Sequence, residues 1–122
     1  MTNCPFCSIA AGDAPAVVVR SWPDAVAIRP RSGGVNPGHV LVLPRVHVDD
    51  VGVDPAVTAA VMRRAAELAA ELPDANVITS KGRVATQTVR HLHVHVVPRR
   101  EDDGLPLPWT PRPAARAGGA AV

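Results

Sequence analysis

Histidine and aliphatic residues alternate at positions 91–96, HLHVHV. Side chains two residues apart share one face of an extended strand, so Leu92, Val94 and Val96 lie opposite the three imidazoles. An aliphatic face packs well into a core, whereas a face with three imidazoles is poor core material. The alternation therefore predicts a strand over residues 89–97 with a functional site on its histidine face.

Apolar periodicity in the rest of the chain indicates an α+β fold. A helix is expected to begin after an Asp54 cap, to bury residues at three- and four-residue steps, and to end before Pro73. A short helical turn is expected over residues 4–11. Together these elements predict a mainly antiparallel five-stranded sheet with one long helix and a short N-terminal helix. The expected strands cover residues 17–22, 26–29, 40–43, 77–79 and 89–97.

Length, charge and hydropathy limit the functions that this chain can have. Its 122 residues suffice for one domain, expected over 1–110, whereas residues 111–122 contain only Pro, Arg, Ala, Gly and Val and predict a disordered tail. A net charge of +2 does not indicate a nucleic-acid surface. No apolar run approaches the ~20 residues of a membrane span, and the first residues lack a secretory signal pattern. We therefore expect a cytoplasmic protein with neither membrane nor nucleic-acid partners.

Two cysteines, Cys4 and Cys7, form a C-x-x-C pair near the start of the chain. The pair alone is compatible with a redox site, half of a zinc site or a structural accident. The redox interpretation is weakened because a thioredoxin-like motif follows a strand, and none is predicted here. Two thiolates and two imidazoles would satisfy tetrahedral Zn²⁺. The spacing does not select two ligands from the five histidines, which are His39, His47, His91, His93 and His95.

The alternating histidines also suit nucleophilic catalysis at phosphorus. A neutral imidazole can attack phosphorus and later leave, provided that an acceptor holds its other ring nitrogen and that donors contact the phosphate oxygens. Gln87 and Thr88 are candidate donors, although ordinary polar residues at a strand entry would look the same. Likewise, His39 could be a strand-edge residue and His47 a solvated loop residue.

Four segments resemble a known family. They are the histidine segment of the form His-φ-His-φ-His-φ-φ at 91–97, with φ an apolar residue, PGHVLVLPRVH at 37–47, QTV at 87–89, and C-x-x-C at 4–7. This combination resembles the histidine triad (HIT) family over residues 4–99, and the cysteine pair makes it similar to the zinc-containing Hint-like branch. The resemblance implies a HIT-like fold and a homodimer.

The resemblance also implies an activity and roles for individual residues. It implies nucleotidyl transfer or hydrolysis at the α-phosphate of a purine nucleotide conjugate, such as a nucleoside phosphoramidate, an aminoacyl-adenylate or a dinucleoside polyphosphate. His93 matches the nucleophile, His95 assists at the phosphate, and His39 lies in the supporting network. Gln87 and Thr88 match positions that contact the phosphate or leaving group. The structural Zn²⁺ ligands that it implies are Cys4, Cys7, His47 and His91.

This chain departs from the family pattern in the substrate pocket. Ser80-Lys81-Gly82 stands where many members have Asn-x-Gly, and Ser80 is a shorter hydrogen-bonding group at the phosphate. The strand that often ends in a ribose-binding aspartate runs Ala27-Ile28-Arg29-Pro30-Arg31 and has no carboxylate. Arg31 could then meet an extra phosphate or a different acyl partner. The scarcity of aromatic residues predicts an aliphatic base pocket with Ile9, Val19 and Ile28.

Two other classes of function compete with a hydrolase or transferase. A nucleotide-binding or interaction module would keep the fold with little turnover, and the departures at Ser80 and Arg31 are its best support. A purely structural zinc protein would leave His93 and His95 unexplained, because zinc does not need them.

Overall fold

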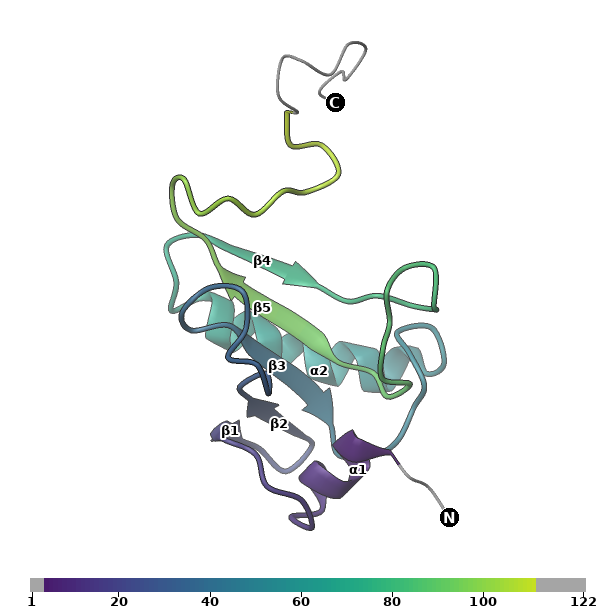
Figure 1. Ribbon diagram of the computed structural model, residues 1–122. Coiled ribbons are helices and arrows are strands. Elements are labelled where there is room, and N and C mark those ends of the chain that lie inside the picture. The colour runs from purple at the N-terminus through teal and green to yellow at the C-terminus, as the bar shows by residue number, and fades with distance from the viewer. Residues whose placement is uncertain (1–3, 112–122) are drawn as a thin grey trace.

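The computed structural model describes residues 4–111, which form a five-stranded antiparallel sheet and two helices. The spatial order of the strands is β1-β2-β3-β5-β4 (Figure 1). This architecture confirms the predicted α+β fold. The elements are α1 (Pro5–Ala10), β1 (Val18–Ser21), β2 (Ala25–Ile28), β3 (Val40–Pro44), α2 (Pro55–Ala69), β4 (Ala75–Ile78) and β5 (Val94–Pro98).

The two faces of the sheet have different covers. Helix α2 lies across one face and buries Val61, Ala65 and Leu68 against it (Figure 1). Helix α1 covers part of the other face, where Phe6 packs with side chains of β2 and β3. Because alternate residues of each strand point to opposite faces, β2 and β3 contribute to both cores. The face that carries α1 also holds a cavity, which is lined in part by Phe6, Ile28 and Leu41.

Helix α2 begins as predicted but ends earlier. Asp54 is its N-cap, and the Asp54 carboxylate accepts a hydrogen bond from the Ala56 backbone N–H at 3.0 Å. The helix ends at Ala69 rather than just before Pro73. The chain tightens there, because the N–H groups of Glu71 and Leu72 bond to carbonyls three residues earlier instead of four.

The predicted histidine strand is shorter than expected. Strand β5 begins at Val94, so the prediction of a continuous strand over residues 89–97 was wrong. The antiparallel pairing with β3 stops at the Val42–Val94 pair, and the Leu92 N–H bonds instead to the Val48 carbonyl at 2.8 Å. The predicted alternation of faces nevertheless holds: Leu92, Val94 and Val96 pack in the core beneath α2.

No helix within residues 4–111 is long and apolar enough to cross a membrane. The predicted disordered tail lies outside the described residues, except for residue 111.

Candidate active site and metal centre

The structure gathers the histidines and cysteines into two adjoining groups, one beside α1 near the end of β3 and one that extends along the sheet to His39 at the start of β3. Four side chains form the candidate metal centre, and their ligand atoms lie within 4.8 Å of one another: Cys4, Cys7, His47 and His91. The other three histidines form a second group. His93 and His95 have ring centroids 5.3 Å apart, and those of His95 and His39 are 5.2 Å apart.

The distances within the metal centre match a tetrahedral zinc site. The Nδ1 atom of His91 lies 3.4 Å from Cys4 Sγ, 3.5 Å from Cys7 Sγ and 3.2 Å from His47 Nδ1. Cys7 Sγ lies 3.3 Å from His47 Nδ1. Bond lengths of about 2.3 Å to sulfur and 2.0 Å to nitrogen place tetrahedral ligand atoms roughly 3.3–3.8 Å apart. These four distances lie close to that range, so the four side chains form a group that could hold a metal ion.

Hydrogen bonds at the outer edges of the two metal-centre histidines aim their Nδ1 atoms inward. His91 Nε2 donates to the Pro44 carbonyl at 2.9 Å, and His47 Nε2 donates to the Asp49 carboxylate at 2.9 Å. In the neutral rings, both Nδ1 atoms then carry lone pairs. Burial lowers the pKa of His91, which favours this neutral form. Two facing lone pairs repel each other, so a cation between them is the arrangement that these rings fit.

His93 is held with the opposite ring orientation. Its Nδ1 atom lies 2.8 Å from the His91 carbonyl, which can only accept, so Nδ1 carries the proton. The lone pair is consequently on Nε2. The Thr79 hydroxyl donates to the His93 carbonyl at 2.8 Å, and the Phe6 ring packs edge-on with its centroid 5.0 Å away. Thr79 and Phe6 were not among the predicted site residues, and only the fold reveals their contacts.

A second chain of hydrogen bonds fixes the proton on His95. The Val35 N–H donates to His39 Nδ1 at 3.1 Å, so His39 carries its proton on Nε2. That Nε2 lies 3.0 Å from His95 Nδ1 and donates to it. His95 is therefore protonated on Nε2 in its neutral form. Burial, together with the neighbouring His93 and His39, lowers the pKa of His95 to about 4, and burial lowers the pKa of His39.

The loop behind His39 is anchored by polar residues that sequence reasoning missed. The Asn36 amide donates to the Pro98 carbonyl at 2.8 Å and to Asp103 at 3.0 Å. Asp103 also receives two bonds from the Arg99 guanidinium, which holds the pKa of its carboxyl far below the usual range. Gly34 has φ +85°, and a Cβ there would lie 2.6 Å from atoms of the His39 side chain. The Gly-Gly dipeptide was the available sequence signal for this tight approach.

The predicted phosphate-contacting residues differ in their surroundings. Gln87 is buried, and its Oε1 accepts from the Gly82 N–H at 2.9 Å while its Nε2 donates to the carbonyls of Asp49 and Val89. This amide therefore holds the loop before the histidine segment. Thr88 is exposed, and Ser80 is half-buried beside Thr79.

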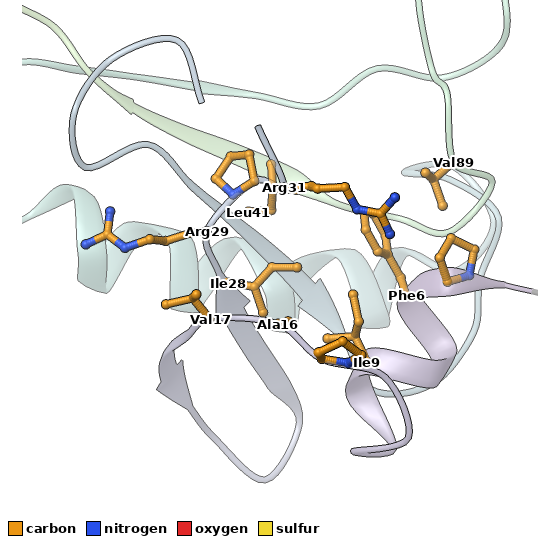
Figure 2. A pocket seen from close by; sticks show the side chains of 12 residues that line it. Phe6, Ile9, Ala16, Val17, Ile28, Arg29, Arg31, Leu41 and Val89 are labelled. Carbon is orange, nitrogen blue, oxygen red and sulfur yellow. The ribbon is translucent and has the colours of Figure 1, made fainter. Parts of the chain in front are cut away.

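An apolar cavity of about 720 Å³ adjoins the second histidine group (Figure 2). Its wall includes Phe6, which contacts His93, and Leu41, which is the register partner of His95. The predicted residues Ile9, Ile28 and Arg31 line it. The prediction of Val19 was wrong, because this side chain packs in the core on the α2 face. The full lining is Pro5, Phe6, Ile9, Pro15, Ala16, Val17, Ile28, Arg29, Pro30, Arg31, Leu41 and Val89.

Comparisons with known proteins identify the family of this chain. The HIT domain model matches residues 11–102. An uncharacterized HIT-like protein of Mycobacterium tuberculosis is 39% identical over 112 residues, covering 84% of this chain and 75% of that protein. The adenosine 5'-monophosphoramidase of Schizosaccharomyces pombe is 30% identical over 118 residues, covering 91% and 86%. A HIT family protein from Bacillus anthracis aligns with a TM-score of 0.78 at 30% identity, covering 88% of this chain and 81% of that one. This chain belongs to the histidine triad (HIT) family.

Proposed function

We propose that this protein hydrolyses nucleotide conjugates at the α-phosphate, with nucleoside phosphoramidates as the favoured class. The observation that carries the proposal is the hydrogen bond from His93 Nδ1 to the His91 carbonyl, which leaves the lone pair on Nε2. Phe6 touches this ring and also lines the apolar cavity, so a bound nucleoside can bring its phosphate to His93. The substrate class is supported by the similarity to an adenosine 5'-monophosphoramidase.

The proposed reaction has two displacements at phosphorus. His93 Nε2 attacks the α-phosphorus, the bond from phosphorus to the leaving amine breaks, and the amine takes a proton from solvent. Water then attacks the nucleotidyl-imidazole and loses a proton to solvent, the P–N bond to His93 breaks and returns the lone pair to Nε2, and the nucleoside monophosphate leaves. The Nε2–H of His95 donates to a non-bridging oxygen, where charge develops in both steps. Thr88 and Ser80 are proposed as further contacts to the phosphate or leaving group.

We propose that the metal centre binds structural Zn²⁺, as in the Hint-like branch. The ion would join α1 to the segment just before β5 and supply no step of the reaction. Its contribution would be to hold His91, whose carbonyl orients His93. A cytoplasmic homodimer remains part of the proposal on the strength of the family resemblance.

Turnover of adenosine 5'-phosphoramidate by the wild type and by His93→Ala tests the proposed hydrolysis. We expect turnover in the wild type and its loss in His93→Ala, with circular dichroism and zinc content unchanged. Equal turnover in the two proteins would contradict the proposal.

A nucleotide-binding module with little turnover is the second candidate function. The observation that favours it concerns the side-chain amide of Gln87, which already bonds to three backbone groups. Both N–H donors of this amide are used in these bonds, so the amide has none left to donate to a substrate phosphate. Tight nucleotide binding by the wild type without hydrolysis of the phosphoramidate would select this candidate.

A further inference from the structure

The charged residues that line the cavity are all positively charged. Among the described residues that line it, Arg29 and Arg31 are the charged ones, and no carboxylate is present. Within residues 4–111, neither guanidinium has a hydrogen-bond or ion-pair partner. By contrast, Arg20 and Arg99 each hold a carboxylate, on Glu71 and Asp103 respectively. The cavity therefore presents uncompensated positive charge beside an apolar wall.

The two arginines point in different directions. In Figure 2 the Arg31 side chain runs over the cavity toward the side where Phe6 and Val89 lie, whereas Arg29 points to the opposite side. Phe6 packs against His93 with a centroid distance of 5.0 Å. Of the two guanidiniums, that of Arg31 is thus the one on the side of the reacting imidazole.

The position of Arg31 indicates which part of a bound nucleotide its guanidinium can contact. A base that fills the apolar cavity and an α-phosphate at His93 place the ribose between them. In-line displacement places the leaving group opposite His93 Nε2 across the phosphorus, with the nucleoside oxygen at one of the three remaining positions. Arg31 lines the cavity that would hold the base, so a group that meets Arg31 there belongs to the nucleoside half of the ligand. On a nucleotide, a phosphate there is carried by the 2'- or 3'-hydroxyl of the ribose.

We propose that this protein prefers nucleotides with a second phosphate on the ribose, and that Arg31 binds this phosphate. This inference rests on the proposed function, because it assumes that a nucleotide fills the cavity. A guanidinium matches phosphate with two parallel charge-assisted hydrogen bonds, whereas ribose hydroxyls leave its charge uncompensated. The aliphatic wall that includes Ile9 and Ile28 accepts the base without aromatic stacking.

Calorimetric titration compares four probes: AMP, adenosine 2',5'-bisphosphate, adenosine 3',5'-bisphosphate and ADP. We expect at least one bisphosphate to bind the wild type about tenfold or more tightly than AMP, the size of one charge-assisted contact. In Arg31→Ala, the affinities of this bisphosphate and of AMP should differ by no more than about twofold. Arg29→Ala is the matched control, which removes the neighbouring guanidinium that points away, and it should retain the preference.

Three results would overturn the inference. They are bisphosphates that bind no more tightly than AMP, a preference that survives Arg31→Ala or disappears in Arg29→Ala, and an equal Arg31-dependent gain for ADP. The last result would assign Arg31 to the leaving-group side.

Turnover of adenosine 5'-phosphoramidate separates this inference from the proposed function. Turnover that depends on His93, without a preference for bisphosphates, contradicts the ribose-phosphate inference alone. A preference that depends on Arg31, without turnover, supports the inference and contradicts the hydrolase. Failure of all four probes to bind contradicts both.

Discussion

Three backbone groups give chemically identical histidines different reactive atoms. The Pro44 carbonyl takes the Nε2 proton of His91 and directs Nδ1 to the metal centre. The His91 carbonyl takes the Nδ1 proton of His93 and leaves the Nε2 lone pair available. The Val35 N–H fixes His39, which in turn fixes His95 as a donor through Nε2. The proton positions of His91, His93 and His39 therefore follow from backbone partners, and that of His95 follows from His39.

Gly34→Ala should disturb this arrangement at His39, whereas Gly33→Ala should not. Both glycines have positive φ, so both substitutions should lower the free energy of unfolding by about 1–2 kcal/mol. The added Cβ at position 34 would lie 2.6 Å from His39, and at position 33 nothing lies within 4 Å. We expect kcat on adenosine 5'-phosphoramidate to fall about tenfold or more in Gly34→Ala alone. Equal kcat values in the two variants would refute the role of this close approach.

The lowered pKa of His95 makes folding stability depend on pH. Its folded pKa is about 4, below the roughly 6.5 of an unfolded histidine. Between these values the unfolded chain binds a proton that the folded chain does not, so stability is greatest above pH 6.5 and falls as pH drops. The slope approaches about 1.4 kcal/mol per pH unit for this group. In urea unfolding at several pH values, His95→Gln should have a shallower slope than the wild type, and parallel slopes would contradict the assignment.

At the scale of helices and strands, the sequence predicted which face of an element is buried better than it predicted the residues at which the element begins and ends. The alternation of aliphatic residues and the Asp54 cap placed the α2 core and the start of α2 correctly, because both signals are local. The start of β5 depends on where its pairing with β3 and β4 stops, which the segment itself does not encode. The Asn36–Asp103 contact was missed because its partners are 67 residues apart.

Family resemblance supplied what spacing left open in the site. Spacing did not select His47 and His91 from five histidines, whereas the resemblance did, and the structure brings both to the cysteines. Gln87 was found as a site residue, but its bonds to the loop backbone follow only from the fold. The prediction of Val19 was wrong because the side chain of a strand residue can point to either face of the sheet. The register shift in β1 between Val18 and Arg20 means that the sequence does not indicate which face Val19 occupies.

Asp103 should anchor the segment after β5 to the loop that carries Asn36. Asp103→Asn weakens the paired bonds to Arg99 and the bond from Asn36, so we expect the free energy of unfolding to fall by about 1–3 kcal/mol. Asp102→Asn is the matched control, because Asp102 is exposed and asparagine tolerates its φ of 59°. Urea unfolding measures both variants, and equal losses would show that the Asp103 contacts add no stability.

At the scale of the whole molecule, the metal centre and the triad share one segment. Cys4 and Cys7 bring α1 to His91, and α1 supplies Phe6 to both His93 and the cavity. The candidate metal centre thereby lies on the same helix as one wall of the cavity, and we propose that a bound Zn²⁺ would hold that wall in place. Loss of the metal should consequently loosen α1 and reduce nucleotide affinity.

Metal analysis of Cys4→Ser, His47→Ala and His93→Ala tests the centre directly. The first two variants should lose stoichiometric zinc, because each removes one of four ligands, and His93→Ala should retain it. Zinc should also dissociate as pH falls, since protons compete for the thiolates and imidazoles. Stoichiometric zinc in both ligand variants would remove the assignment.

The central claim is that His93 becomes covalently nucleotidylated. Intact mass spectrometry of the wild type, acid-quenched within milliseconds of mixing with adenosine 5'-phosphoramidate, tests it most directly. We expect an added adenylyl group on the wild type and none on a His93→Ala protein whose fold and zinc content match those of the wild type. Turnover by the wild type without any adduct, or an equal adduct on His93→Ala, would contradict it.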